Sequence, residues 1–181
     1  DDTSFAVVND DKKVDFHETI NHRKFHREHG GVVPEMAARQ HLDIMDHLAR
    51  FQKKINFTKV DAIASTYGPG LIGGLIVGSS FAKGLALSYQ KKIIPINHLQ
   101  AHLLSPRLVS KVSFPYLCLL VSGGNTALVL VKGVKKFITL GSTIDDSAGE
   151  CFDKVAKAMK LGYPGGPVIE KLALDADPST F

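Results

Sequence analysis

The chain has 181 residues, of which 44% are hydrophobic and 22% charged. That composition belongs to a folded globular protein and excludes a disordered segment, a collagen-like fibre and a low-complexity chain. The net charge of +4 permits an anionic partner but is too small to require one, so charge leaves nucleic-acid binding open.

Two further classes of protein are disfavoured by the positions of particular residues. Cys118 and Cys151 have no partner spacing, which argues against a disulfide framework and a cysteine-type zinc site. The best apolar run, residues 70–87, contains Lys83 and five glycines, so no membrane span is expected. A reducing compartment is therefore favoured over secretion.

Strands and helices alternate over residues 5–108. The hydrophobic periodicity predicts three strands, each followed by a helix. The strands are expected over residues 5–8, 60–66 and 92–97, and the helices over 34–54, 71–89 and 99–108. The first strand leads into a polar turn over 9–13, whereas residues 14–29 show no clear pattern. Strands joined through helices predict crossover units and a largely buried sheet.

The pattern changes near residues 110–114, where we expect a domain boundary. Beyond it, three β-type runs are expected over residues 115–121, 127–131 and 136–140. Two helices follow, over residues 147–160 and 168–174. The short turns between the three runs predict an antiparallel meander. Ser147 is placed to cap the first of these helices, with Glu150 at the capping-box position.

Two pairs of histidines are separated by four residues. In a helix this spacing puts His98 and His102 on one face, where two neutral imidazoles could share a metal ion. A third ligand would have to come from elsewhere, and the spacing by itself favours a surface or interface pair. His22 and His26 have the same spacing but lie in the least regular part of the sequence, where solvated histidines are expected.

Two glycine segments could approach a ligand with their backbone. Ser122-Gly123-Gly124 ends a buried strand and could offer N–H groups to a phosphate, although the spacing favours a simple hairpin. The glycines of residues 68–74 precede a helix, which allows either an anion at the helix start or close packing of helix against strand. That segment lacks the Walker and Rossmann spacings.

An acidic stretch follows the meander. Asp146, Glu150 and Asp153 have helical spacing, so one face would carry three carboxylates that could bind hydroxyls, amines or a metal. The alternative is complementation of the helix macrodipole, which fits Asp145 and Asp146 better than Asp153.

Seven motifs, taken together and in order, are more specific than any one of them. They are DDTS at 1–4, HxxxGGVVPE with ARxHL at 26–42, GPGLIG at 68–73, NHLxAH at 97–102, VSGG at 121–124, DDxAGExFDK at 145–154 and GYPGGP at 162–167. With these motifs the chain resembles the universal family of tRNA threonylcarbamoyladenosine transferases, also once catalogued as O-sialoglycoprotein endopeptidases. The resemblance is nearer to the bacterial and organellar branch than to the archaeal and eukaryotic cytoplasmic one.

The resemblance implies the actin-like ATPase fold, a two-lobed α/β fold shared by sugar kinases and Hsp70, with the ligand between the lobes. Residues 1–112 would form the first lobe without its first strand, and residues 113–181 the beginning of the second, so the chain is expected to be truncated at both ends. The implied activity is transfer of a threonylcarbamoyl group from threonylcarbamoyl-adenylate to N6 of adenosine 37 in tRNAs that read ANN codons.

The resemblance also implies site residues. One divalent ion per subunit, iron or zinc, would be held by His98 and His102, with an aspartate beyond Phe181 completing the metal site. The nucleoside and phosphate of the adenylate would be bound by Leu120, Val121, Ser122, Gly123, Gly124, Asp153 and Gly166. Asp1 and Asp2 match the acidic first loop near the phosphates and metal, which makes them the implied catalytic residues.

The adenylate is a mixed anhydride and is already activated, so positioning and charge stabilisation suffice and direct transfer without a protein nucleophile is expected. The implied partners are tRNA, a paralogous scaffold subunit and a small ATPase subunit, or a second copy of the chain if the protein is organellar. The implied location is the bacterial cytoplasm, with the mitochondrion as the alternative.

Two other functions stay open on the sequence. A metalloprotease would agree with the older family name, but Gln100 stands between the histidines and the sequence has no H-E-x-x-H motif. A non-catalytic scaffold paralogue of the same fold would have no chemical need for His98 and His102.

Overall fold

The structure is a computed structural model that describes residues 2–22, 26, 31–51, 55–177 and 179–180. Its secondary structure is mixed α/β, and its contacts divide the chain into two compact units. Unit 1 comprises Asp1–Lys24 and Val32–His102, and unit 2 comprises Phe25–Gly31 and Leu103–Phe181. The expected lobes, 1–112 and 113–181, stay a prediction because compact units need not coincide with lobes.

Unit 1 begins with an antiparallel hairpin of β1 (Asp2–Val8) and β2 (Val14–Asn21). The turn over residues 9–13 was predicted and is confirmed: the Asn9 N–H donates to the Lys13 carbonyl at 3.0 Å. The second strand was not predicted. Its apolar residues Phe16 and Ile20 face the same way as the half-buried Glu18, and this carboxylate interrupts the alternation that marks a strand.

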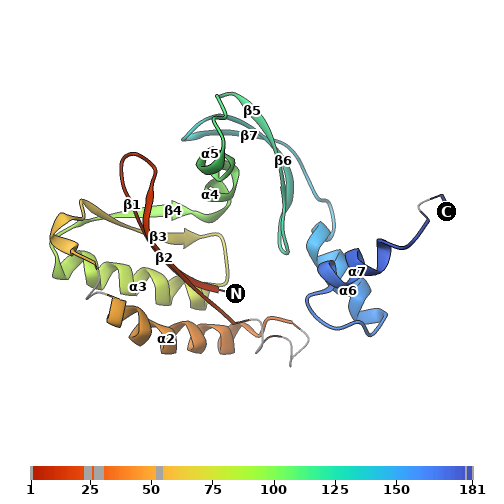
Figure 1. Cartoon of the computed structure of the whole chain (residues 1–181), viewed down its shortest axis with the longest axis horizontal. Helices are drawn as coiled ribbons and strands as arrows, with labels where there is room; N and C mark the ends of the chain where they lie inside the picture. The colour runs from red at the N-terminus through yellow and green to blue at the C-terminus, as the bar shows by residue number, and fades with distance from the viewer. Residues whose placement is uncertain (1, 23–25, 27–30, 52–54, 178, 181) are drawn as a thin grey trace. The chain divides into compact units, whose positions relative to one another are not determined.

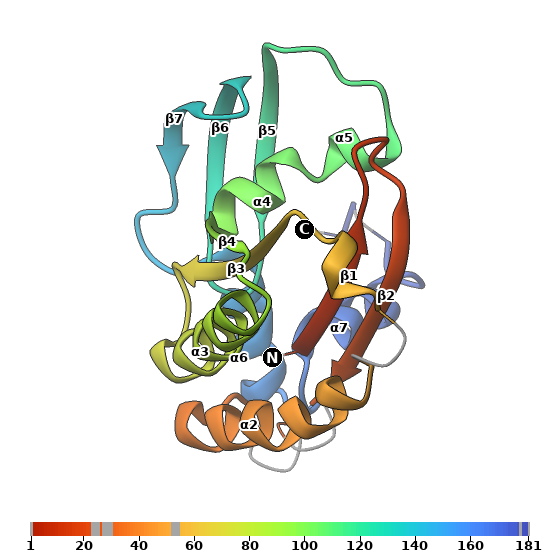
Figure 2. The same cartoon turned by 90° about the vertical axis from the view of Figure 1, so that its left-hand side faces the viewer.

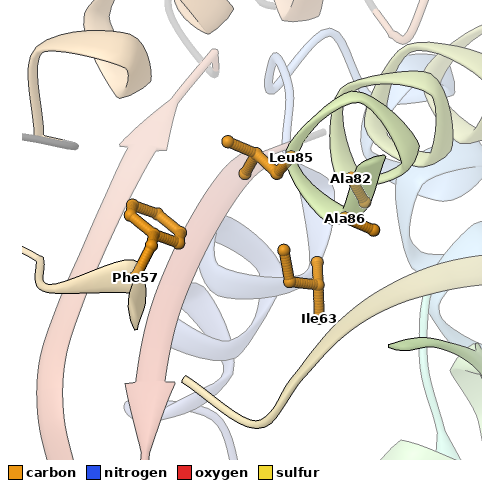
Figure 3. Packing of buried hydrophobic residues seen from close by; sticks show 5 residues of the cluster. All are labelled: Phe57, Ile63, Ala82, Leu85 and Ala86. Atoms are coloured by element: carbon orange, nitrogen blue, oxygen red, sulfur yellow. The ribbon is translucent and has the colours of Figure 1, made fainter. Parts of the chain in front are cut away.

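The central element of unit 1 is a parallel pair, β3 (Ala62–Gly68) and β4 (Lys92–Asn97), joined through α3 (Ile72–Ser88). This is the predicted crossover unit. Its core forms where α3 and the short helix η2 (Phe57–Lys59) meet the pair, and Figure 3 shows the side chains gathered between them. The buried residues of this core are Phe57, Ile63, Ala82, Leu85 and Ala86.

The expectation of a largely buried sheet is wrong for the described part of the chain. Ile94 of β4 is 45% exposed, and Ala64 and Thr66 of β3 are exposed as well. Ile63 faces the core that α3 and η2 cover, whereas Ala64, the next residue along the strand, points to the opposite, uncovered face together with its register partner Ile94.

The helix α2 (Pro34–Phe51) packs against α3, as Figure 1 shows. A Cβ added at Gly73 would lie 2.6 Å from the Cβ of Ala38, so glycine lets the two helices approach closely. One glycine of residues 68–74, Gly73, therefore lies at a helix–helix contact. The sequence had suggested either packing of the helix against a strand or an anion site for this segment.

The predicted helix over 99–108 is divided in two. After β4 the chain forms α4 (His98–Leu104) and then the four-residue α5 (Pro106–Val109). Pro106 has no N–H to donate to a preceding carbonyl, so the hydrogen-bond pattern of the first helix stops before it, although Ser105 keeps helical φ and ψ angles.

Unit 2 contains the predicted meander of β5 (Tyr116–Val121), β6 (Thr126–Gly133) and β7 (Lys136–Ser142), which lie in that order (Figure 2). Central β6 carries the most buried residues of the sheet, Val129 at 4% and Val131 at 0% exposed. The meander is confirmed because both connections are short hairpins, whose pairing is decided locally.

Two helices follow, α6 (Ala148–Ala158) and α7 (Gly165–Ala173). The predicted cap of α6 is confirmed, since the Ser147 hydroxyl accepts from the Glu150 N–H at 3.4 Å. The start of α7 lies three residues before the predicted residue 168, because Pro167 is compatible with the first turn of a helix. Within the described residues, no helix is both long and apolar enough to cross a membrane.

Candidate functional site

His98 and His102 face each other on α4. Their Nε2 atoms are 3.2 Å apart and their ring centroids 4.5 Å apart, and both side chains are exposed. The predicted juxtaposition of the two imidazoles is therefore confirmed, and it follows from the four-residue spacing on a helix.

The helix that carries the two histidines begins immediately after β4. The side-chain oxygen of Asn97, the last residue of that strand, accepts from the Gln100 N–H at 3.0 Å. Asparagine is among the preferred residues for capping a helix N-terminus, so Asn97 fixes where α4 starts. Asn97 was not predicted to have this role, although an asparagine directly before a helix is the usual signal for it.

The electrostatics of this pair suit a metal ligand. Partial burial, and after it the charge of His102, lower the pKa of His98 below the ordinary value of 6.5. A lowered pKa keeps the imidazole neutral at physiological pH, and only the neutral form coordinates a metal. Two imidazole nitrogens that already converge fit two positions of a divalent ion, whereas the described residues contain no group of three His, Cys, Asp or Glu that could hold one.

The segment Ser122-Gly123-Gly124 forms the hairpin between β5 and β6. The Ser122 N–H donates to the Asn125 carbonyl at 2.8 Å, and the Asn125 N–H donates to the Ser122 hydroxyl at 3.1 Å. Apart from the glycine itself and its chain neighbours, no described atom lies within 4 Å of a Cβ built at Gly123 or Gly124. The hairpin prediction is confirmed, and both glycines of its turn are exposed.

This hairpin is held against the start of α6. The Ser147 hydroxyl donates to the Gly123 carbonyl at 2.5 Å, in addition to accepting from Glu150. The Ala148 N–H donates to the Thr126 hydroxyl at 2.8 Å. One serine hydroxyl therefore caps the helix and binds the hairpin, using its donor and one acceptor position.

Asp153 contacts the next segment expected to bind substrate. Its Oδ1 accepts from the Gly165 N–H at 2.7 Å, at the start of α7 and one residue before Gly166. Beside Asp153 lies an open pocket of about 580 Å³ whose lining includes Lys157 and Lys160, so an anionic ligand would meet two cationic side chains there. The structure thus brings Asp153 and Gly166 into one neighbourhood.

The expectation of three carboxylates acting on one face is wrong. Lys154 binds Asp146 at 2.6 Å and Glu150 at 3.2 Å, and these hydrogen bonds raise the pKa of Lys154. Asp153 instead contacts α7 through Gly165. Asp146 and Glu150 therefore share Lys154, whereas Asp153 is separated from them by its hydrogen bond to the start of α7.

The first two residues were expected to be catalytic. Asp1 lies outside the described residues. Asp2 is exposed at the start of β1, where its register partner is Asn21. Their catalytic role stays a prediction.

The expectation of solvated histidines at 22 and 26 is also wrong. His22 is 7% and His26 2% exposed, and the two belong to different units. The Nδ1 of His22 lies 3.0 Å from Gln40 Oε1, and its Nε2 lies 3.0 Å from the hydroxyl of Thr3. That hydroxyl is also 2.7 Å from His41 Nδ1, so His22 belongs to a buried hydrogen-bond network.

Comparison with known proteins identifies the family. The family model described as TsaD, tRNA N6-adenosine threonylcarbamoyltransferase, matches residues 13–181. Proteins of that name from Orientia tsutsugamushi (strain Boryong) and Paramagnetospirillum magneticum (strain AMB-1) are each 50% identical to the whole chain, which covers 54% and 53% of their lengths. The protein of that name from Wolbachia pipientis wMel is 48% identical, with 55% of its length covered.

The chain spans about half the length of the curated relatives it matches. The family model, by contrast, covers nearly all of the chain. The chain belongs to the tRNA N6-adenosine threonylcarbamoyltransferase family.

Proposed function

We propose that this protein is an acyltransferase that moves a threonylcarbamoyl group from threonylcarbamoyl-adenylate to N6 of adenosine 37 in tRNAs that read ANN codons. The observation that supports this most is the 50% identity, along the whole chain, to proteins named for that transferase. We propose with it the two-lobed actin-like fold, with residues 1–112 in the first lobe and 113–181 in the second.

The adenylate would be bound by the hairpin and by the segment around Asp153. The exposed backbone of Gly123 and Gly124 suits phosphate oxygens, which N–H groups bind well. Oδ1 of Asp153 accepts a hydrogen bond from the Gly165 N–H, which fixes the orientation of the carboxylate. Its second oxygen can then accept a hydrogen bond from a ribose hydroxyl. Gly166, with no described atom within 4 Å of its Cβ position, leaves room for the nucleoside.

His98 and His102 would hold one divalent ion, iron or zinc, since both are exposed and their Nε2 atoms converge. When bound, such an ion polarises a carbonyl or phosphoryl oxygen as a Lewis acid. The acidic residues Asp1 and Asp2 would lie near the phosphates. Because the anhydride is already activated, the residues of the chain need only orient it beside the adenine amine, with no covalent intermediate on the protein.

Partners follow from the same proposal. We expect tRNA as substrate, with a paralogous scaffold subunit and a small ATPase subunit, or a second copy of the chain if the protein is organellar. The corresponding location is the bacterial cytoplasm or the mitochondrion. No observation favours the metalloprotease or the non-catalytic scaffold.

The test is reconstitution with the full-length protein. Unmodified tRNA would be incubated with ATP, threonine, bicarbonate, the adenylate-forming enzyme and the candidate partner subunits, and its nucleosides analysed by mass spectrometry. We expect threonylcarbamoyladenosine only when the full-length protein is present. Absence of this nucleoside with chemically supplied adenylate and all partner subunits would contradict the proposal.

A further inference from the structure

Gly149, in the first turn of α6, has no room for a side chain. A Cβ at this position would lie 2.7 Å from the Ser122 carbonyl oxygen, 2.8 Å from Gly123 Cα and 2.9 Å from Gly123 N. Real Cβ atoms essentially never come within 3.0 Å of such atoms. The requirement for glycine is therefore one of space between the helix and the hairpin.

The crowded atoms belong to backbone, so they cannot rotate out of the way as a side chain would. Hydrogen bonds also tie them to α6: the Gly149 N–H donates to the Ser122 carbonyl at 3.3 Å, and the Ser147 hydroxyl donates to the Gly123 carbonyl. A methyl group at position 149 would have to displace the hairpin and lengthen these bonds.

Gly165 makes an equally close contact on another part of α6. A Cβ there would lie 2.5 Å from the Phe152 carbonyl oxygen and from the Ala156 Cβ, and 2.9 Å from Asp153 Cα. The same residue donates its N–H to Asp153 Oδ1. The close approach of α7 therefore also sets the orientation of the Asp153 carboxylate.

The two contacts have one element in common. Through Gly149, α6 holds the hairpin at its N-terminal turn, and through Gly165 it holds the start of α7 farther along. These are the two segments proposed to bind the phosphate and the nucleoside of one adenylate. Since a bound substrate must meet both, the distance between them has to be set to a fraction of an ångström.

We propose that Gly149 and Gly165 are positioning residues for the adenylate: they set the separation of its two binding segments by seating both on α6. This inference rests on the proposed function. Neither glycine needs to touch the substrate. Other glycines of unit 2, such as Gly141, have no described atom within 4 Å of a Cβ and carry no such requirement.

The test uses full-length Gly149→Ala and Gly165→Ala, with Gly141→Ala as the matched control. We expect the KM for the adenylate to rise by about tenfold or more in both variants, while the KM for tRNA stays unchanged. The control should leave both constants at the wild-type values. A general loss of folded protein would instead lower the apparent kcat and leave both KM values alone, and it would contradict positioning.

A second measurement does not depend on activity. Amide hydrogen exchange over residues 122–126 should speed up in Gly149→Ala and stay unchanged in Gly165→Ala and Gly141→Ala. If Gly149→Ala does not fold, Ser147→Ala removes a hairpin bond without adding atoms, and should produce the same exchange change with a smaller rise in KM. Unchanged exchange and KM in these variants would overturn the inference. Faster exchange in a protein whose wild type does not bind adenylate would contradict the proposed function and leave the positioning of the hairpin supported.

Discussion

Unit 1 contains two pairs of neighbouring imidazoles with opposite surroundings. The ring centroids of His98 and His102 are 4.5 Å apart, and those of His22 and His41 are 4.9 Å apart. The first pair is exposed with its Nε2 atoms converging. In the second pair His22 is buried, and protein partners engage both of its nitrogens.

With both rings neutral, hydrogen-bond chemistry allows one arrangement of the protons in the pair of His22 and His41. The amide oxygen of Gln40 only accepts, so Nδ1 of His22 carries a hydrogen and its Nε2, in the neutral ring, accepts from the Thr3 hydroxyl. The oxygen of Thr3 then accepts from Nδ1 of His41. Nitrogens committed in this way hold a fold together, whereas the Nε2 atoms of His98 and His102 face each other at the surface.

The largest effect is expected from removing either exposed histidine. In the full-length protein, His98→Ala or His102→Ala should weaken affinity for zinc or iron by about 100-fold or more, because few ligands remain. Tm in the metal-free state should change little, since both side chains are exposed. Metal content by mass spectrometry and competition with a chelator would measure this, with exposed His17→Ala as control; equal metal content in all variants would refute the metal role.

Thr3→Val should affect stability and leave metal binding unchanged. Valine has the shape of threonine but lacks the hydroxyl, so the buried Nε2 of His22 and the half-buried Nδ1 of His41 lose that partner, at a cost of about 1–3 kcal/mol in free energy of unfolding. Urea denaturation would measure it. Ser4→Ala, whose hydroxyl is exposed, should stay within about 0.5 kcal/mol of the wild type. Equal stability of the two variants would show that the buried network contributes nothing.

Gly74→Ala probes how firmly that network holds His41. A Cβ at this position would lie 3.2 Å from Nε2 and Cδ2 of His41, so the ring must move, at an expected cost of about 1 kcal/mol. Gly84→Ala is the matched control on the same helix, with no described neighbour within 4 Å, and should stabilise by about 0.5 kcal/mol. In a Thr3→Val background the cost at Gly74 should shrink; an unchanged cost would mean that Thr3 does not restrain the ring.

The smallest effect concerns protonation of the exposed pair in metal-free protein. Because the folded pKa of His98 lies below 6.5, the stability it contributes is complete above pH 6.5 and is lost as the pH falls through the folded pKa. NMR titration should place the His98 midpoint below 6.5. In His102→Ala the midpoint should move upward yet remain lowered, because burial is the larger cause. A midpoint at or above 6.5 in the wild type would contradict the lowered pKa of His98.

Features that depend on neighbours in sequence were predictable. The juxtaposition of His98 and His102 follows from a four-residue spacing on a helix, and the hairpin at Gly123 and Gly124 follows from two strands joined by a short turn. The family resemblance rested on such local motifs as well, which is why it agrees with the comparison to known proteins.

Features that depend on distant residues were not predictable. The burial of His22 requires Thr3, nineteen residues before it, and Gln40, eighteen after it. Gly149 must be glycine because of a hairpin that precedes it by more than twenty residues, and Asp153 is oriented by a glycine twelve residues later. Periodicity and spacing report only on the few residues of one turn or one strand. Burial and close packing arise when separate elements meet, so the same histidine spacing gave a converging surface pair at 98 and 102 and a fold-supporting network at 22.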